Sequence, residues 1–168
     1  MSSPEFGEAV VNGTRLQVNA AATQPLSAWL RAHAGCASIH AGCEEGVCGA
    51  CTVLVDGVSR RACLTVSAQI AGCTVTTAEG VAASAAGLRL QQAFVRCHAA
   101  QCGYCTPGFL MIGLELMAEY AGREPPDELT LRHRLSAAIC RCTGYASIVA
   151  AMTEALEEQA KANEERAR

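Results

Sequence analysis

Four cysteines lie close together in one glycine-rich stretch of this 168-residue chain, GCEEGVCGACTVLVDGVSRRAC at residues 42–63. Only 4% of the residues are aromatic and 11 are cysteines, so a core of small side chains would gain much from metal cross-links. This stretch therefore constrains the fold more than any other feature. Its cysteines, which could form disulfides, a zinc site or an iron–sulfur site, are Cys43, Cys48, Cys51 and Cys63.

The charge and the apolar pattern exclude several classes of protein. The net charge of −3 leaves no polybasic patch, so we expect no nucleic-acid partner and no binding to anionic membrane surfaces. The most apolar stretch, PGFLMIGLELMAEYAG, contains Glu115 and Glu119 and is too short to cross a bilayer, so we expect no membrane insertion. The first residues, MSSPEFGEAV, carry no export signal. We therefore expect a cytoplasmic protein, in which clustered cysteines bind metal more often than they form disulfides.

The first half of the chain has the pattern of a small α+β domain. Asn12-Gly13 lies between two β-prone runs and predicts a hairpin, because both residues tolerate positive φ. The apolar residues of QPLSAWLRAHAG have helical spacing, and Gly35 predicts the end of that helix. Alternating β-branched segments after the first cysteines complete a small mixed sheet. We place this domain at residues 1–78.

The second half of the chain has the pattern of a helical bundle. From Ser84 onward the apolar residues recur at helical spacing, and loop-like segments separate the periodic runs. We place this second domain at residues 79–168. The predicted helices span 84–99, 107–121, 127–139 and the residues from 145 onward.

The spacing of the first cysteine set, C-x4-C-x2-C-x11-C, favours a [2Fe-2S] cluster. Four thiolates can hold either tetrahedral zinc or such a cluster. Zinc sites usually combine short C-x2-4-C pairs, whereas three of these cysteines share one loop. Gly46 and Gly49 would let that loop fold tightly and aim N–H groups at the sulfurs, which stabilises the extra negative charge of a reduced cluster.

The position of Cys63 predicts an irregular hairpin around the Asp-Gly turn at residues 56–57. With a two-residue turn, Cys51 pairs with Ala62, and Cys63 points to the other side of the sheet. One extra residue, in a three-residue loop or a bulge, would place Cys51 opposite Cys63. We therefore expect that irregularity.

A second set of four cysteines has ligand-like spacing in the helical half. Its pairs are QCGYC, with Cys102 and Cys105, and CRC, with Cys140 and Cys142. They fall at the start of one predicted helix and the end of another, and neither pair is decisive by itself. A thioredoxin-like dithiol needs a βαβ setting that the pattern lacks, and a Rieske centre needs paired histidines that the four histidines do not provide.

Three motifs in the same order carry a resemblance to one family: GCEEGVCGACTVLVDG…RRACL, QCGYCTPGFLM and ICRCTGYASIV. The chain is similar to the small two-cluster iron–sulfur subunit of the molybdenum hydroxylases, which include xanthine dehydrogenase, aldehyde oxidoreductase and molybdenum carbon monoxide dehydrogenase. The resemblance implies a plant-ferredoxin-like β-grasp domain followed by a four-helix bundle, each with one [2Fe-2S] cluster. It places the first cysteine set nearer the flavin and the second set nearer the molybdenum.

The resemblance also implies partners and a role. Gln101 and Cys142 would lie against the pterin of the molybdenum cofactor. Molybdopterin and FAD are expected in a large molybdenum subunit and a medium FAD subunit, assembled as a dimer of heterotrimers. The chain itself has no G-x-G-x-x-G motif and no P-loop, so we interpret it as the electron-transfer subunit of a complex that oxidises its substrate in another chain. A stand-alone ferredoxin and a zinc-binding interaction module are the alternatives.

Some residues near the motifs depart from the family pattern or fall outside it. The gap between the QCGYC and CRC pairs is longer than usual in the family, and the usual Ser-Gly-Asn before CRC is replaced by SAAI at residues 136–139. Arg141, between two ligands, is expected to point away from the metal, toward the surface or a subunit interface. We predict that His40 is a polar loop residue. The cysteines outside both sets, predicted to be small buried residues, are Cys36, Cys73 and Cys97.

Overall fold

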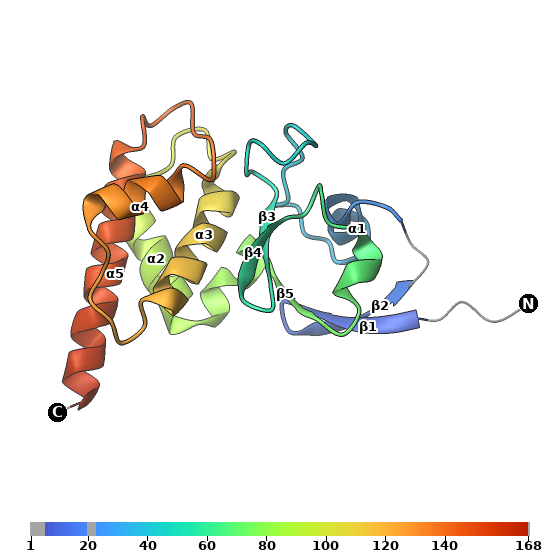
Figure 1. Cartoon of the computed structure of the whole chain (residues 1–168), viewed down its shortest axis with the longest axis horizontal. Helices are drawn as coiled ribbons and strands as arrows, with labels where there is room; N and C mark the ends of the chain where they lie inside the picture. The colour runs from blue at the N-terminus through green and yellow to red at the C-terminus, as the bar shows by residue number, and fades with distance from the viewer. Residues whose placement is uncertain (1–5, 20–22, 168) are drawn as a thin grey trace, which may run out of the picture.

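The computed structural model describes residues 6–19 and 23–167. The described residues form a five-stranded sheet and five α-helices. Figure 1 shows one helix beside the sheet and the other helices grouped next to it. The predicted fold class, an α+β chain with a ferredoxin-like sheet domain followed by a helical bundle, is confirmed.

The predicted hairpin opens the sheet. It is formed by β1 (Phe6–Val11) and β2 (Thr14–Asn19), and the register leaves only two residues for the turn. Asn12 and Gly13 have φ values of 49° and 86°, as a type I′ turn requires. The hairpin predicted from Asn12-Gly13 is therefore confirmed.

Three short strands complete a mixed sheet in the order β2-β1-β5-β3-β4. β1 and β5 are parallel, and the other neighbours are antiparallel. Helix α1 packs its apolar side chains against the sheet to form a first core, whose largest fully buried members are Leu26, Leu30, Ile39 and Ile70. The elements added here are α1 (Leu26–His33), β3 (Thr52–Val55), β4 (Val58–Arg61), β5 (Thr74–Thr76) and the 3-10 helices η1 (Ser67–Ile70) and η2 (Ala78–Ala83).

The predicted irregularity in the turn between β3 and β4 is wrong. The two strands pair in regular register up to the turn, where Val55 pairs with Val58. The two turn residues, Asp56 and Gly57, have φ values of 50° and 81°, which are those of a regular type I′ turn.

Cys63 instead reaches the first site through a tight turn that follows β4. The N–H groups of Leu64 and Thr65 both donate to the carbonyl oxygen of Arg61, at 3.0 and 3.1 Å. This turn brings the Cys63 thiol beside that of Cys51, although the hairpin register alone would point it away. The alternation of side chains along a strand does not extend to Cys63, because this residue lies beyond the end of β4.

The helical region contains four helices, as predicted. The Ser84 hydroxyl accepts a hydrogen bond from the N–H of Gly87 at 3.0 Å and caps the first helix. Asp127 Oδ1 accepts from the N–H of Thr130 at 2.7 Å and caps the third. The helices are α2 (Ala85–Arg96), α3 (Thr106–Glu119), α4 (Glu128–Leu135) and α5 (Ala146–Ala167).

Helix α4 is shorter than the helix predicted at 127–139, and the prediction of its end is wrong. The helix stops at Leu135, Ser136 caps it, and residues 137–139 continue as a turn and an irregular segment. There the N–H of Ile139 donates to the carbonyl oxygen of Cys48 at 2.9 Å. A contact with the first cysteine loop therefore replaces the last helical turn, and helical periodicity does not reveal such a contact.

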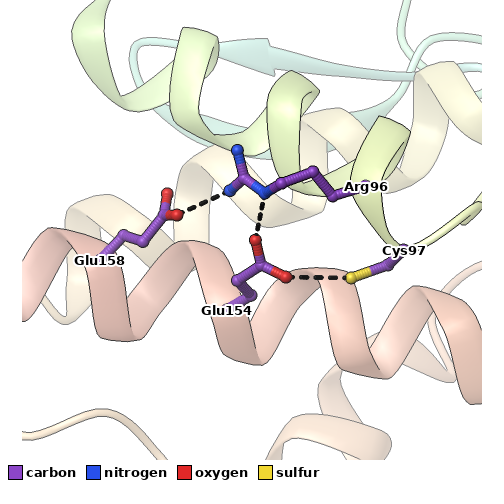
Figure 2. Close-up of polar contacts among 4 residues, drawn as sticks. All are labelled: Arg96, Cys97, Glu154 and Glu158. Atoms are coloured by element: carbon purple, nitrogen blue, oxygen red, sulfur yellow. Dashed lines mark hydrogen bonds and ion pairs between the residues drawn. The ribbon is translucent and has the colours of Figure 1, made fainter.

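A second core fills the space between the helices and also reaches the sheet. Strand β3 is buried along its length, because Val53 belongs to the first core and Leu54 to the second. At the surface of the helices, Arg96 of α2 pairs with Glu154 and Glu158 of α5 (Figure 2). Large fully buried members of the second core are Leu90, Phe109, Met111, Leu116, Leu131, Leu135 and Ile148.

Of the three cysteines outside the two sets, only Cys36 is buried as predicted. It is 2% exposed and accepts a hydrogen bond from the Thr77 hydroxyl at 3.6 Å. Cys73 and Cys97 are half-buried, so the prediction is wrong for both. Cys97 lies at the edge of the α2–α5 contact, where its thiol donates to Glu154 at 3.2 Å (Figure 2).

Candidate metal centres

Three loops and the turn after β4 bring the two cysteine sets to one side of the molecule. The loop between α1 and β3 carries most of the first set. The loop between α2 and α3 carries Cys102 and Cys105, and the loop between α4 and α5 carries Cys140 and Cys142. All three loops lie toward the top of the view in Figure 1.

The first set forms two pairs of neighbouring cysteines. The N–H of Cys48 donates to the sulfur of Cys43 at 3.4 Å, and the buried Cys51 lies beside Cys63. Backbone hydrogen bonds from Cys48 and Glu45 lower the pKa of Cys43 to about 7. Burial, and then the Cys51 thiol, raises the pKa of Cys63 to about 11. Because a metal binds thiolates, its binding at this site would release protons.

The second set has an exposed outer pair and a more deeply placed inner pair. The Cys142 thiol donates to the sulfur of Cys102 at 3.5 Å, and both residues are exposed. Cys140 is buried, and its thiol neighbours that of Cys105. Burial, and then the hydrogen bond with Cys140, raises the pKa of Cys105 to about 12. The outer pair is therefore the part of this set that a partner molecule can reach.

Two residues that the sequence reasoning missed support Cys140 from the same loop. Thr143 Oγ1 lies 3.2 Å from the Cys140 sulfur, and the Thr143 N–H donates to it at 3.5 Å. Burial raises the pKa of Cys140, but the hydrogen bonds from Thr143, Cys142 and Cys105 together outweigh burial and lower it. Tyr145 Oη accepts from the N–H of Cys140 at 3.2 Å and donates to the carbonyl oxygen of Ala138 at 2.9 Å. Thr143, which directly follows the CRC pair, was the available signal, because threonine side chains often hydrogen-bond to nearby backbone.

The donor sets fit a [2Fe-2S] cluster better than a single metal ion. A tetrahedral zinc site gathers four ligands around one point. Among the described residues, no three cysteine, histidine or carboxylate side chains converge closely enough to hold one ion. A [2Fe-2S] cluster instead takes four thiolates, two at each iron, and the arrangement of each set in pairs suits that requirement.

The remaining predicted residues lie around these sets. Gln101 is exposed beside the outer pair of the second set, and Arg141 is exposed, as expected of a residue that points away from the metal. His40, predicted to be a polar loop residue, stacks its ring on that of Tyr104 with centroids 4.5 Å apart. Within the described part of the chain, no helix combines the length and the hydropathy that crossing a membrane requires.

Two family models match the chain one after the other. A model described as a 2Fe-2S iron–sulfur cluster binding domain matches residues 9–76, and a model described as a [2Fe-2S] binding domain matches residues 77–153. Each match contains one complete cysteine set.

Known proteins similar to this chain cover nearly the same length. The nicotine 6-hydroxylase small subunit of Paenarthrobacter nicotinovorans is 46% identical over 145 residues, which are 86% of each chain. The xanthine dehydrogenase iron-sulfur-binding subunit of Escherichia coli O157:H7 is 42% identical over 143 residues, 84% of this chain and 88% of the relative. The crystal structure of quinoline 2-oxidoreductase from Pseudomonas putida 86 contains a chain with 37% identity and a TM-score of 0.81, and the match covers 97% of this chain and 99% of that chain.

Proposed function

The chain belongs to the small [2Fe-2S] subunits of the molybdenum hydroxylases, and on this premise we propose that each of its two cysteine sets ligates one cluster. The chain is an electron-transfer component of an oxidoreductase and does not itself act on the substrate. The proposed ligands are Cys43, Cys48, Cys51 and Cys63 for the first cluster and Cys102, Cys105, Cys140 and Cys142 for the second.

The observation that carries this function is the placement of both sets on neighbouring loops of one chain. The hydrogen bond from Ile139 to Cys48, at 2.9 Å, joins the residue before one proposed ligand directly to a proposed ligand of the other set. Each bound cluster supplies a site that takes up and releases one electron. Two such sites held side by side form a path for single electrons.

The residues of the chain prepare each set for this chemistry. The N–H of Cys48 aimed at the Cys43 sulfur, and the Thr143 groups aimed at the Cys140 sulfur, stabilise negative charge on the ligands. Burial of Cys51 and Cys140 keeps water from the inner side of each set. These contacts tune the sites and leave the chemistry of the substrate to another chain.

Exposed residues beside each cysteine set support the proposal that this chain lies between two partner subunits. Gln101 and Cys142 are exposed, and we propose that they meet the pterin of a molybdenum cofactor held by a large subunit. Beside the first set, Val47 and Leu64 are 62% and 61% exposed, and apolar side chains grouped in this way suit a protein interface. We propose that a medium FAD subunit covers them, in a cytoplasmic dimer of heterotrimers. We also propose that the chain divides into two cluster domains at residues 1–78 and 79–168.

Spectroscopy of ligand variants tests the ligand assignment. The purified chain, reduced anaerobically with dithionite, is expected to give two distinguishable electron paramagnetic resonance (EPR) signals at low temperature. Cys48→Ser should alter one signal and Cys105→Ser the other, because each removes one thiolate from one set. Cys73→Ser is the matched control, since Cys73 is a half-buried cysteine outside both sets. The assignment fails if the control changes a signal, or if a folded ligand variant keeps both signals unaltered.

A further inference from the structure

The loops that carry the two cysteine sets are packed backbone against backbone. A Cβ atom on Gly49, between two proposed ligands of the first set, would lie 2.7 Å from the carbonyl oxygen of Ala137 and 2.8 Å from Cα of Ala138. A Cβ on Gly108, in the first turn of α3, would overlap the carbonyl oxygen of Gly49. The first loop therefore touches both segments that carry the second set.

Arg61, the last residue of strand β4, hydrogen-bonds to both sides of this contact between the cysteine loops. Its Nε donates to the carbonyl oxygen of Gly46 at 3.2 Å, inside the first cysteine loop, and its Nη1 donates to the Thr52 hydroxyl at 2.7 Å. Its Nη2 donates to the carbonyl oxygen of Ala137, three residues before Cys140. One guanidinium therefore joins the first loop, the sheet and the second set, which a planar fork of donors can do and an ammonium cannot.

A pair of stacked rings joins the first cysteine loop to the loop between α2 and α3. His40 Nδ1 donates to the carbonyl oxygen of Tyr104 at 2.7 Å, and the two rings stack with an interplanar angle of 15°. Tyr104 lies between two proposed ligands of the second set, whereas His40 precedes the first set by three residues. The Tyr104 ring also packs against Gly42, because a Cβ there would lie 3.3 Å from Cε1 of Tyr104. The Tyr104 side chain thus reaches from the second loop to the residue that precedes Cys43, a proposed ligand of the first set.

We propose that Arg61, His40 and Tyr104 form an inter-loop bridge that fixes the separation of the two clusters, which makes them positioning residues for electron transfer between the sites. The inference rests on the proposed function. In the step concerned, one electron leaves the second site and one electron arrives at the first, with no bond broken and no proton transferred. The bridge contacts no substrate and provides no ligand, so its effect is on the rate of this step and on the magnetic interaction of the two sites.

The test uses the purified chain with both clusters bound. The first readout is the broadening of the low-temperature EPR spectrum that two nearby reduced clusters cause. The second is the rate at which an electron injected by pulse radiolysis redistributes between them. In Arg61→Met and Tyr104→Leu we expect weaker broadening and a lower rate than in the wild type, because both the magnetic interaction and the electron-transfer rate fall as the distance between the two clusters grows.

Two matched variants separate positioning from general damage. Arg60 is the exposed neighbour of Arg61, so Arg60→Met should behave as the wild type. Tyr104→Phe keeps the ring and the carbonyl acceptor, and it should also behave as the wild type. If Arg61→Met loses its clusters, Arg61→Lys takes its place, because lysine keeps the charge but lacks the fork.

The outcomes distinguish this inference from the function on which it rests. Full cluster content in Arg61→Met and Tyr104→Leu, with unchanged broadening and rate, would overturn the inference alone. A wild-type chain that does not bind two clusters would overturn the proposed function and the inference together. Weaker EPR broadening and slower electron redistribution in Arg61→Met and Tyr104→Leu, with Arg60→Met and Tyr104→Phe unchanged, would support the inter-loop bridge.

Discussion

Replacing Gly49 with alanine should separate the two cysteine loops. The residue has a φ of +73°, and the added Cβ would lie 2.7 to 2.9 Å from three atoms of Ala137 and Ala138. Two of these atoms belong to the backbone, which cannot rotate away as the end of a flexible side chain can. The segment before Cys140 therefore has to move.

The cost of this change has two parts. An alanine in the left-handed region costs about 1–2 kcal/mol, and forcing a methyl group into a packed contact costs about 1–3 kcal/mol more. Gly57→Ala isolates the first part, because Gly57 has a φ of +81° and its added Cβ would meet nothing within 4 Å. The difference between the two variants is therefore about 1–3 kcal/mol, the cost of the close approach alone.

Thermal unfolding of the cluster-loaded chain measures this difference. For a chain of this size 1 kcal/mol shifts the midpoint by about 2–4 °C, so Gly49→Ala should melt about 2–12 °C below Gly57→Ala. Both variants are compared at one scan rate, because loss of a bound metal group makes unfolding irreversible. Equal midpoints for the two variants would refute the argument that the loops touch through Gly49.

Three further changes test the support around the sites. Tyr145→Phe removes the hydroxyl that accepts from the N–H of Cys140, so we expect a loss of about 1–3 kcal/mol in thermal unfolding and reduced iron content. Ser84→Ala removes the cap of α2, and urea unfolding should show a loss of about 1 kcal/mol with the clusters unchanged. Burial raises the pKa of Glu79, but hydrogen bonds from Ser38 and a neighbouring hydroxyl outweigh it and lower the pKa below 4.5. Its contribution to stability is therefore present above pH 4.5 and is lost as the pH falls through the lowered pKa, so Glu79→Gln should flatten that part of the pH–stability curve.

Each of these expectations has a result that would contradict it. Normal iron content and an unchanged melting midpoint in Tyr145→Phe would show that the hydroxyl does not support the Cys140 loop. Loss of a cluster in Ser84→Ala would show that the cap acts beyond its helix. If the stability of Glu79→Gln falls with decreasing pH as steeply as that of the wild type, Glu79 does not contribute to the pH dependence of stability.

The sequence predicts best those features that depend on neighbouring residues. The Asn12-Gly13 hairpin follows from two residues that tolerate positive φ, and the four helices follow from apolar spacing. The cysteine sets were found in the same way, because each ligand loop carries its own short spacing. Such local rules fail at Cys63. The turn after β4 decides where the Cys63 thiol lies, and the register of the β3–β4 hairpin does not.

Contacts between distant segments were not predictable from the sequence. The hydrogen bond from Arg61 to Ala137 spans 76 positions, and that from His40 to Tyr104 spans 64. Neither pair has a pattern that periodicity or spacing can detect, because both depend on how the sheet and the helices dock. The same docking ends α4 early, so that residues 136–139 meet the first cysteine loop.

One chain holds two [2Fe-2S] clusters if both cysteine sets act as proposed. Iron, acid-labile sulfide and zinc analysis of the purified chain tests it most directly. We expect a brown protein with about four iron and about four sulfide per chain, two of each for every set of four cysteines, and no stoichiometric zinc. A colourless, folded protein that contains zinc and lacks sulfide would contradict it.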